Sequence, residues 1–142
     1  MLYLTGEFNH QIDNKNRIRI PNKLAGNETG FYFSKGTNSC LFVYYKEAFN
    51  ELAQKIMENA RMSDEDENMA LRVLSKSFTW VEGDSQGRMI LPVKLKEFAK
   101  NDKDIVICGA GSHIEIWAQE VHDEYFRDED ENFDALFKKL RL

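Results

Sequence analysis

The sequence predicts an α+β fold built from two copies of one unit, in which strands precede helices. Two alignments lead to this prediction. Residues 11–24 (QIDNKNRIRIPNKL) match residues 82–95 (EGDSQGRMILPVKL) at a constant offset of 71. Residues 40–49 (CLFVYYKEAF) match residues 113–122 (HIEIWAQEVH) at an offset of 73. Because these repeats are longer than solenoid units, we expect a duplicated domain comprising residues 1–75 and 76–142.

The first copy is predicted to open with two strands, at 8–12 and 17–20, joined by a turn at 13–16. In the second of these strands isoleucine alternates with arginine, so one face is apolar and the other is basic. Pro21 cannot donate a hydrogen bond to a neighbouring strand, and we expect the strand to end there.

Strands and then helices are predicted for the rest of the first copy. Two strands are expected at 30–34 and 40–44, separated by a segment rich in turn-forming residues. Residues 45–60 carry apolar side chains at helical spacing. A second helix is expected to begin with Ser63 as its N-cap, because three acidic residues follow it and complement the helix dipole.

The second copy is predicted to repeat this order. One or two helices are expected in 119–142, interrupted around the acidic run Asp128–Glu131. Short strands are marginal alone and leave sheet edges exposed, so we expect the two copies to pair with each other as one pseudo-twofold unit. The expected strands are 78–81, 88–91, 105–108 and 113–117.

Composition and charge restrict the class of protein. The chain has 142 residues, of which 42% are hydrophobic and 30% charged, and a net charge of −5, which is ordinary for a globular protein. We find no apolar run typical of a signal peptide or a membrane span, and two cysteines are too few for a disulfide framework. We therefore expect a soluble cytoplasmic protein.

The charge is unevenly distributed along the chain. Residues 11–25 carry a net charge of +3 and residues 84–100 carry +2, whereas residues 118–142 carry −4. Both basic segments coincide with the repeated motif, so the distribution indicates a binding surface more than the total charge does.

The strongest motif is Asp-x-x-Gly-Arg at 84–88, which has the counterpart Asp-x-x-Asn-Arg at 13–17. An aspartate at the start of such a turn accepts backbone N–H groups. Its fourth position needs a positive φ, which glycine adopts freely and asparagine tolerates. The expected structural residues of the two turns are Asp13, Asn16, Asp84 and Gly87.

The arginine that ends each motif has two possible roles. As the first residue of a strand, the guanidinium of Arg17 or Arg88 can bind a phosphate or the O6/N7 edge of guanine. Alternatively, each arginine only pairs with the aspartate of its own turn, an interaction that contributes little when exposed. The duplication and the neighbouring lysines favour binding.

The segments GEFNHQIDNKNRIRIPNKL and FTWVEGDSQGRMILPVKL resemble the two signature segments of the MraZ family, and the resemblance extends over essentially the whole chain. Members of this family regulate the bacterial gene cluster for division and cell-wall synthesis. The resemblance implies a tandem, duplicated pair of swapped-hairpin AbrB-type units that form one β-barrel with peripheral helices. It also implies self-association into rings that bind short repeated sequences upstream of their own operon. Asn16 departs from the family pattern, which usually has glycine there.

We therefore expect a sequence-specific DNA-binding transcriptional regulator that acts as a homo-oligomer, in a ring, on double-stranded DNA with repeated promoter boxes. It is expected to associate with the nucleoid and to need no cofactor, metal, membrane or small-molecule substrate. Arg17 and Arg88 are expected to make the main contacts to DNA. The expected DNA-binding residues are Arg17, Arg88, Lys15, Arg19, Lys23 and Lys94.

Two other classes of function were weighed against this one. An antitoxin-like interaction module of the same fold would use its helical C-terminus, but such modules generally carry one copy and a disordered tail. An enzyme is disfavoured because no histidine lies in a recognisable catalytic motif. Cys108 could share a metal with His113 or form a nucleophile pair with His122, but neither pair has a supporting motif.

For two sets of apolar residues, the sequence allows more than one packing partner. Aromatic residues in the predicted strands could stack on nucleic-acid bases, although packing in the core is favoured; these are Phe31, Phe33, Phe42, Tyr44 and Trp117. A stripe at helical spacing on the last segment could dock on its own domain or, as we prefer, on a neighbouring subunit; it comprises Phe133, Leu136, Phe137 and Leu140.

Overall fold

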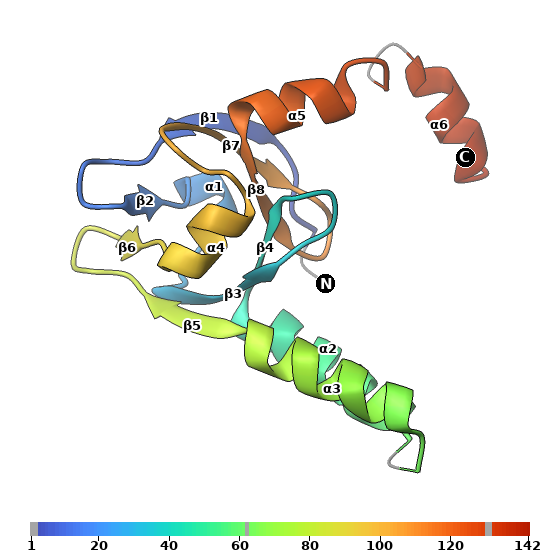
Figure 1. Cartoon of the computed structure of the whole chain (residues 1–142). Coiled ribbons are helices and arrows are strands. Elements are labelled where there is room, and N and C mark those ends of the chain that lie inside the picture. The colour runs from blue at the N-terminus through green and yellow to red at the C-terminus, as the bar shows by residue number, and fades with distance from the viewer. Residues whose placement is uncertain (1–2, 62, 130–131) are drawn as a thin grey trace.

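The computed structural model describes residues 3–61, 63–129 and 132–142 and has an α+β fold (Figure 1). The strands are β1 (Glu7–Gln11), β2 (Arg17–Arg19), β3 (Gly30–Lys35), β4 (Leu41–Tyr44), β5 (Thr79–Glu82), β6 (Arg88–Ile90), β7 (Asp104–Gly109) and β8 (Ile114–Ala118). The helices are α1 (Asn22–Ala25), α2 (Lys46–Asn59), α3 (Glu65–Ser77), α4 (Val93–Phe98), α5 (Gln119–Phe126) and α6 (Phe133–Lys139).

Strands from the two sequence repeats are interleaved in one sheet. Its six strands run in the order β1-β7-β8-β4-β3-β5, and all neighbours are antiparallel. The counterparts in the two repeats are β1 and β5, β3 and β7, and β4 and β8. If each strand is replaced by its counterpart, the same strand order results, read from the opposite edge of the sheet. The remaining strands, β2 and β6, form a separate two-stranded ribbon that again joins the two repeats. Residues 1–75 and 76–142 therefore contribute to shared layers.

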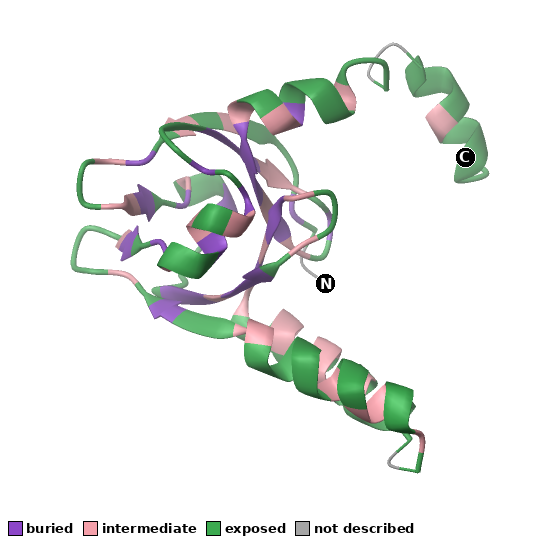
Figure 2. Ribbon diagram, viewed as in Figure 1, coloured by how far each residue is buried: buried purple, intermediate pink, exposed green. Residues whose placement is uncertain are grey.

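The main core lies between one face of the six-stranded sheet and the β2–β6 ribbon with α1 and α4. Ile18 of β2 and Met89 of β6 point into it, and so do Leu24 of α1 and Leu95 of α4. These side chains pack against the alternating apolar residues of the central strands (purple in Figure 2). Because the same layer holds the ribbon in place, the core fixes the two turns at the ends of the ribbon.

The opposite face of the sheet carries a second, smaller apolar cluster. Cys40, Val106 and Trp117 are buried there, and Phe126 of α5 packs against them. On the same face, the ring of Tyr32 stacks on Phe49 of α2 at 3.8 Å between centroids. Helices therefore cover this outer face at both ends.

Two helical parts extend away from the β layers. Helices α2 and α3 form a hairpin at the lower right of Figure 1, and α6 projects at the upper right. None of these three helices contains a buried residue (Figure 2). Among the described helices, none combines the length and the apolar character needed to cross a lipid bilayer.

The predicted strands and long helices are present, with boundaries shifted by one or two residues. The expected N-cap of α3 is wrong: Asp64, rather than Ser63, caps the helix and accepts a hydrogen bond from the Glu67 amide at 3.0 Å. Two short helices, α1 and α4, were not predicted; each follows the proline that ends the preceding strand. Phe31, Phe33 and Trp117 lie in the core, whereas Phe42 and Tyr44 are half-buried on the outer face.

Candidate nucleic-acid interface

The first motif forms a tight turn organised by Asp13. Its Oδ1 accepts the backbone N–H groups of Lys15 at 2.9 Å and Arg17 at 2.8 Å. The turn closes with a hydrogen bond from the Asn16 amide to the Asp13 carbonyl at 3.0 Å, and Asn16 has a φ of 60°. One carboxylate thereby satisfies two donors of the turn and places Arg17 at the start of β2.

The second motif repeats this geometry 71 residues later. Asp84 Oδ1 accepts from the amides of Gln86 and Arg88, both at 2.9 Å. The Gly87 amide donates to the Asp84 carbonyl at 2.9 Å, and Gly87 has a φ of 80°. The two turns are therefore equivalent in backbone structure although their residues differ.

Each motif arginine is held by the aspartate of its own turn. Arg17 Nε donates to Asp13 Oδ2 at 2.7 Å, and Arg88 Nε donates to Asp84 Oδ2 at 2.8 Å. Among the described residues, no hydrogen bond involves the terminal nitrogens of either guanidinium. The pairing therefore orients each arginine through one of its five N–H donors and leaves four for another ligand.

Both turn aspartates are stabilised in their charged form. The backbone N–H of Arg17 is the main reason that the pKa of Asp13 lies below its ordinary value, and the Arg17 guanidinium adds to this effect. The backbone N–H of Arg88 lowers the pKa of Asp84 in the same way. The two turns thus keep their charged hydrogen-bond acceptors to a lower pH than an ordinary aspartate would.

The β2–β6 ribbon brings the arginines of the two repeats together. In its register Ile18 lies opposite Met89 and Arg19 lies opposite Arg88. Cross-strand partners share a face, so the first pair points into the core and the second points away from it. Ile90, opposite Arg17, is on the same outward face and is 65% exposed.

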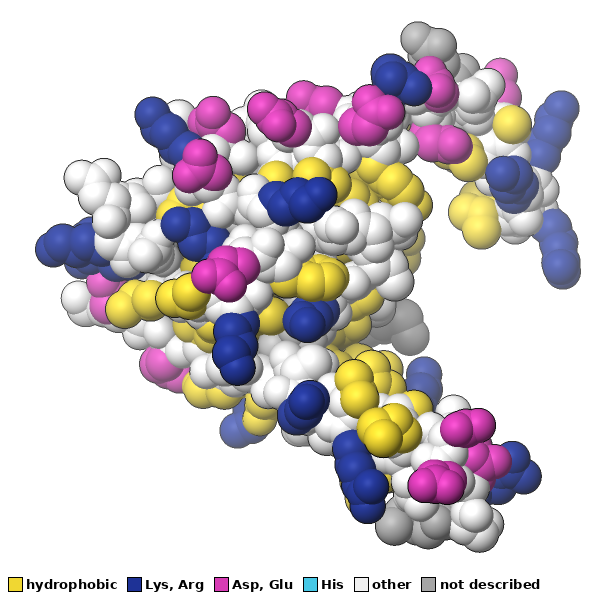
Figure 3. All heavy atoms as spheres, in the orientation of Figure 1, with side chains coloured by type: hydrophobic (Ala, Val, Ile, Leu, Met, Phe, Trp, Pro, Cys, Tyr) yellow, Lys and Arg dark blue, Asp and Glu magenta, His cyan; other side chains and the backbone are white. Residues whose placement is uncertain are grey.

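A hollow of about 220 Å³ is lined by three arginines from this face: Arg17, Arg19 and Arg88. His10 and Gln86 also line it. Burial lowers the pKa of His10, and the positive charge of Arg19 lowers it further. Figure 3 shows basic side chains (dark blue) protruding at the edge of the molecule where the two turns lie. The hollow, which Asp13 also lines, therefore gathers guanidinium groups of the kind that bind an anion or the acceptor edge of a base.

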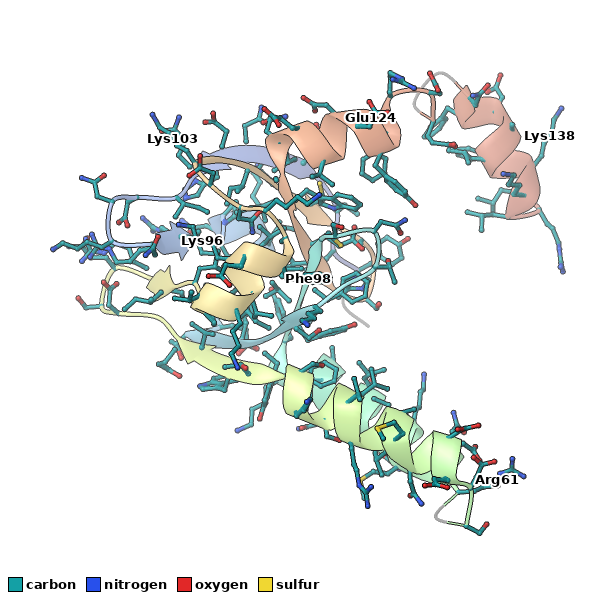
Figure 4. The ribbon with its side chains drawn as sticks, viewed as in Figure 1. Arg61, Lys96, Phe98, Lys103, Glu124 and Lys138 are labelled. Atoms are coloured by element: carbon teal, nitrogen blue, oxygen red, sulfur yellow. The ribbon has the colours of Figure 1, made fainter. Side chains whose placement is uncertain are left out.

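None of the three predicted lysines lines this hollow. Lys15 is exposed in the first turn, and Lys23 and Lys94 are exposed on α1 and α4. A fourth lysine was missed by the sequence analysis: Lys96 Nζ donates to Asn16 Oδ1 at 2.7 Å (Figure 4). Lys96 and Asn16 are 80 residues apart in the chain, so no local pattern could have linked them.

Gln86 was also missed as a member of the site. It lies at the tip of the second turn, and the corresponding residue of the first turn is Lys15. A possible set of metal ligands lies elsewhere, on the outer face of the sheet, and comprises Glu7, Cys108 and His122.

Comparison with known proteins gives consistent matches along the chain. The family model described as "MraZ protein, putative antitoxin-like" matches residues 3–73 and 78–141. The transcriptional regulator MraZ of Moorella thermoacetica is 35% identical over 137 residues, which covers 95% of this chain and 94% of that protein. The protein of the same name from Thermoanaerobacter pseudethanolicus is 34% identical over 139 residues, or 96% of each chain. The chain therefore belongs to the MraZ family.

Proposed function

We propose that this protein is a sequence-specific DNA-binding transcriptional regulator rather than an enzyme. The observation that carries the proposal is the register of the β2–β6 ribbon, which places Arg19 opposite Arg88 and joins the motif arginines of both repeats around one hollow. Its relatives are named transcriptional regulators, which supports the same conclusion.

The arginines and lysines of the interface have different roles in this proposal. Arg17 and Arg88, oriented by Asp13 and Asp84, direct their terminal N–H groups at guanine O6 and N7 or at phosphate. Arg19 lies between them and supplies a further cation. Lys15, Lys23 and Lys94 extend the positive surface and bind phosphates, which position the protein on the duplex without specifying sequence.

The protein is proposed to act as a homo-oligomer, in a ring, on repeated boxes upstream of its own division and cell-wall operon, and thus on the nucleoid. One cluster of arginines neutralises few phosphates and binds weakly alone. Several copies joined in a ring act on adjacent boxes with a high effective concentration, so their affinities combine. In this proposal the interleaved strands of the two repeats are a tandem AbrB-type unit of swapped hairpins.

The surfaces that join the copies are proposed to be α6 and the α2–α3 hairpin of the next copy. Phe133, Phe137 and Leu140 are 60%, 47% and 72% exposed, so the apolar stripe of α6 is left uncovered by its own chain. A groove between α2 and α3 is lined mainly by apolar side chains. Residues 58–61 and 63–67 of this hairpin have a combined net charge of −4 and residues 133–141 have +2, so the surfaces are complementary.

A gel-shift titration with the DNA immediately upstream of the gene for this protein tests the proposal. We expect the wild-type protein to bind, with an affinity that falls as salt rises. Arg17→Ala together with Arg88→Ala should weaken binding at least about thirtyfold, because each arginine contact to a base contributes about 1–3 kcal/mol.

The matched control removes two exposed basic side chains that lie outside both the hollow and the proposed surfaces between copies, Lys103 and Arg127, by substitution with alanine. This variant loses the same charge and should bind DNA like the wild type. Equal affinity of the double arginine variant and the wild type at the same salt would refute the interface. A chain that fails to bind this DNA but binds a protein partner through α6 would instead be an antitoxin-like module.

A further inference from the structure

Three side chains that can bind a metal converge on the outer face of the sheet, where α5 packs over β1 and β7. Glu7 of β1 and Cys108 of β7 are cross-strand partners, so their side chains share a face. His122 lies on α5, which covers that face. One ligand atom of each residue lies within 4.8 Å of the others. Three elements that are distant in the sequence thus supply a carboxylate, a thiol and an imidazole to one point.

Both nitrogens of the His122 ring have carboxylate partners. Nε2 lies 3.0 Å from Glu7 Oε1, and Nδ1 lies 3.1 Å from Asp123 Oδ1. A carboxylate on the second nitrogen is typical of metal-bound histidines, because it fixes the tautomer and raises the basicity of the ligand. Asp123 therefore prepares Nε2 to bind a cation.

The surroundings of Cys108 are also suited to a cation. Cys108 lies between two carboxylates of the sheet, because Glu7 of β1 and Glu115 of β8 are both its cross-strand partners. Among the described residues, the only ion-pair partner of Glu7 is His122, so no lysine or arginine balances these carboxylates. The Glu7 side chain is 61% exposed, which leaves a path for an ion from solvent.

We propose that Glu7, Cys108 and His122 form a Zn²⁺ site whose fourth position is taken by water. The mixed sulfur, nitrogen and oxygen donors match the preference of zinc for tetrahedral sites. On binding, the Cys108 thiol releases its proton to solvent. His122 coordinates through a deprotonated Nε2 while its Nδ1–H donates to Asp123, and the ion replaces the present contact between Nε2 and Glu7.

This site goes beyond the proposed regulation of transcription, since it lies on a different face from the arginine-lined hollow. A bound ion would cross-link β1, β7 and α5, so it would hold α5 against the sheet. We therefore expect zinc to raise the thermal midpoint of the full-length protein.

Cobalt substitution in the full-length, chelator-treated protein tests the site. We expect one Co²⁺ per chain, a sulfur-to-cobalt charge-transfer band, the visible spectrum of a tetrahedral site, and displacement by Zn²⁺. Cys108→Ser should abolish the charge-transfer band, lower the zinc affinity at least about tenfold in competition with a chromophoric chelator, and remove the thermal shift. The matched control, Cys40→Ala, changes the other cysteine of the same face and should keep all three signals.

The exposed carboxylate provides a second variant that does not disturb the core. Glu7→Gln should retain the charge-transfer band and lower the zinc affinity about tenfold, and it replaces Cys108→Ser if circular dichroism shows that variant to be unfolded. The site is wrong if the wild-type protein shows no charge-transfer band, if the band survives in folded Cys108→Ser, or if Glu7→Gln binds zinc as tightly as the wild type. None of these results depends on binding to DNA.

Discussion

Asn16 and Gly87 meet the same backbone requirement with different side chains. Both residues have a positive φ at the fourth position of their turns. Glycine has no Cβ to clash there, and asparagine is one of the few other residues that tolerate the region. The Asn16 side chain also accepts a hydrogen bond from Lys96 of the second repeat. The side chain of Asn16 thus links the first turn to α4.

The requirement at Gly87 predicts a measurable loss of stability in Gly87→Ala. A Cβ at this position would meet only Arg19 Nε at 3.7 Å, an ordinary contact, so the cost arises from the positive φ alone. We expect the free energy of unfolding in urea to fall by about 1 kcal/mol. Gly87→Asn, which copies the first turn, should lose less. Equal stability of Gly87→Ala and the wild type would show that the turn can relax.

The turn aspartates predict how stability responds to acid. Hydrogen bonds from the turn lower the pKa of Asp13 and Asp84 below the ordinary value of 3.8. Their contribution to stability is therefore complete above this value and is lost as the pH falls through the lower pKa of the folded state. Thermal midpoints measured from roughly pH 2 to pH 6 should fall at the acidic end.

The double variant Asp13→Asn/Asp84→Asn separates this effect from general acid denaturation. It cannot titrate at these positions, so its thermal midpoint should depend less on pH than that of the wild type at the acidic end. It should also bind DNA more weakly, because the arginines lose their charged partners. An acidic limb identical to that of the wild type would assign the pH dependence to other carboxylates.

The sequence could predict the residues of the two turns, but it could not predict which group each arginine pairs with. The motif left two roles open for Arg17 and Arg88, and the structure contains the pairing with Asp13 and Asp84 through Nε. That pairing is compatible with binding, because the terminal nitrogens are not used in it. Lys96 reaches the first turn only through the tertiary fold, so no local pattern could identify it.

At the scale of elements, short segments were the least predictable. Helices α1 and α4 have four and six residues, which is too short for an apolar period to be recognised. Each buries one leucine, Leu24 or Leu95, and tertiary packing therefore fixes their structure. Longer helices such as α2 were predictable because several apolar residues recur at helical spacing.

Removal of α6 tests the proposed surface between copies. A chain truncated after Asn132 loses the exposed stripe of Phe133, Phe137 and Leu140 but no buried residue. We expect its mass by light scattering to fall below that of the full-length oligomer, with unchanged secondary structure in the remaining chain. Phe137→Asp should have the same effect, and Ala135→Ser, also exposed on α6, should not. An unchanged oligomer mass in the truncated chain would refute the role of α6.

At the scale of the molecule, the pairing between the repeats decides which surfaces exist. Two alignments within the sequence predicted the duplication, and the exposed edges of its short strands suggested that the copies pair. The strand order could not be predicted, since alternation of apolar residues says which face is buried and not which strand is adjacent. The ribbon shows the consequence: Arg19 and Arg88 become neighbours only through β2–β6 pairing.

The shared sheet predicts that neither repeat folds alone as a monomer. In the six-stranded sheet β1 pairs only with β7 and β5 pairs only with β3, so each edge strand depends on the other repeat. Separate chains of residues 1–75 and 76–142 would expose apolar side chains of the common core. We expect each chain alone to show no cooperative thermal transition as a monomer.

An equimolar mixture of the two chains should recover the transition, with a midpoint that rises with concentration because association is now bimolecular. Circular dichroism with light scattering measures both properties in one sample. A chain of residues 1–75 that melts cooperatively while its mass is that of a monomer would show that the first repeat has a sufficient core of its own. A concentration-dependent homodimer of this chain would instead agree with the shared sheet, since each strand has a counterpart that can replace its missing partner.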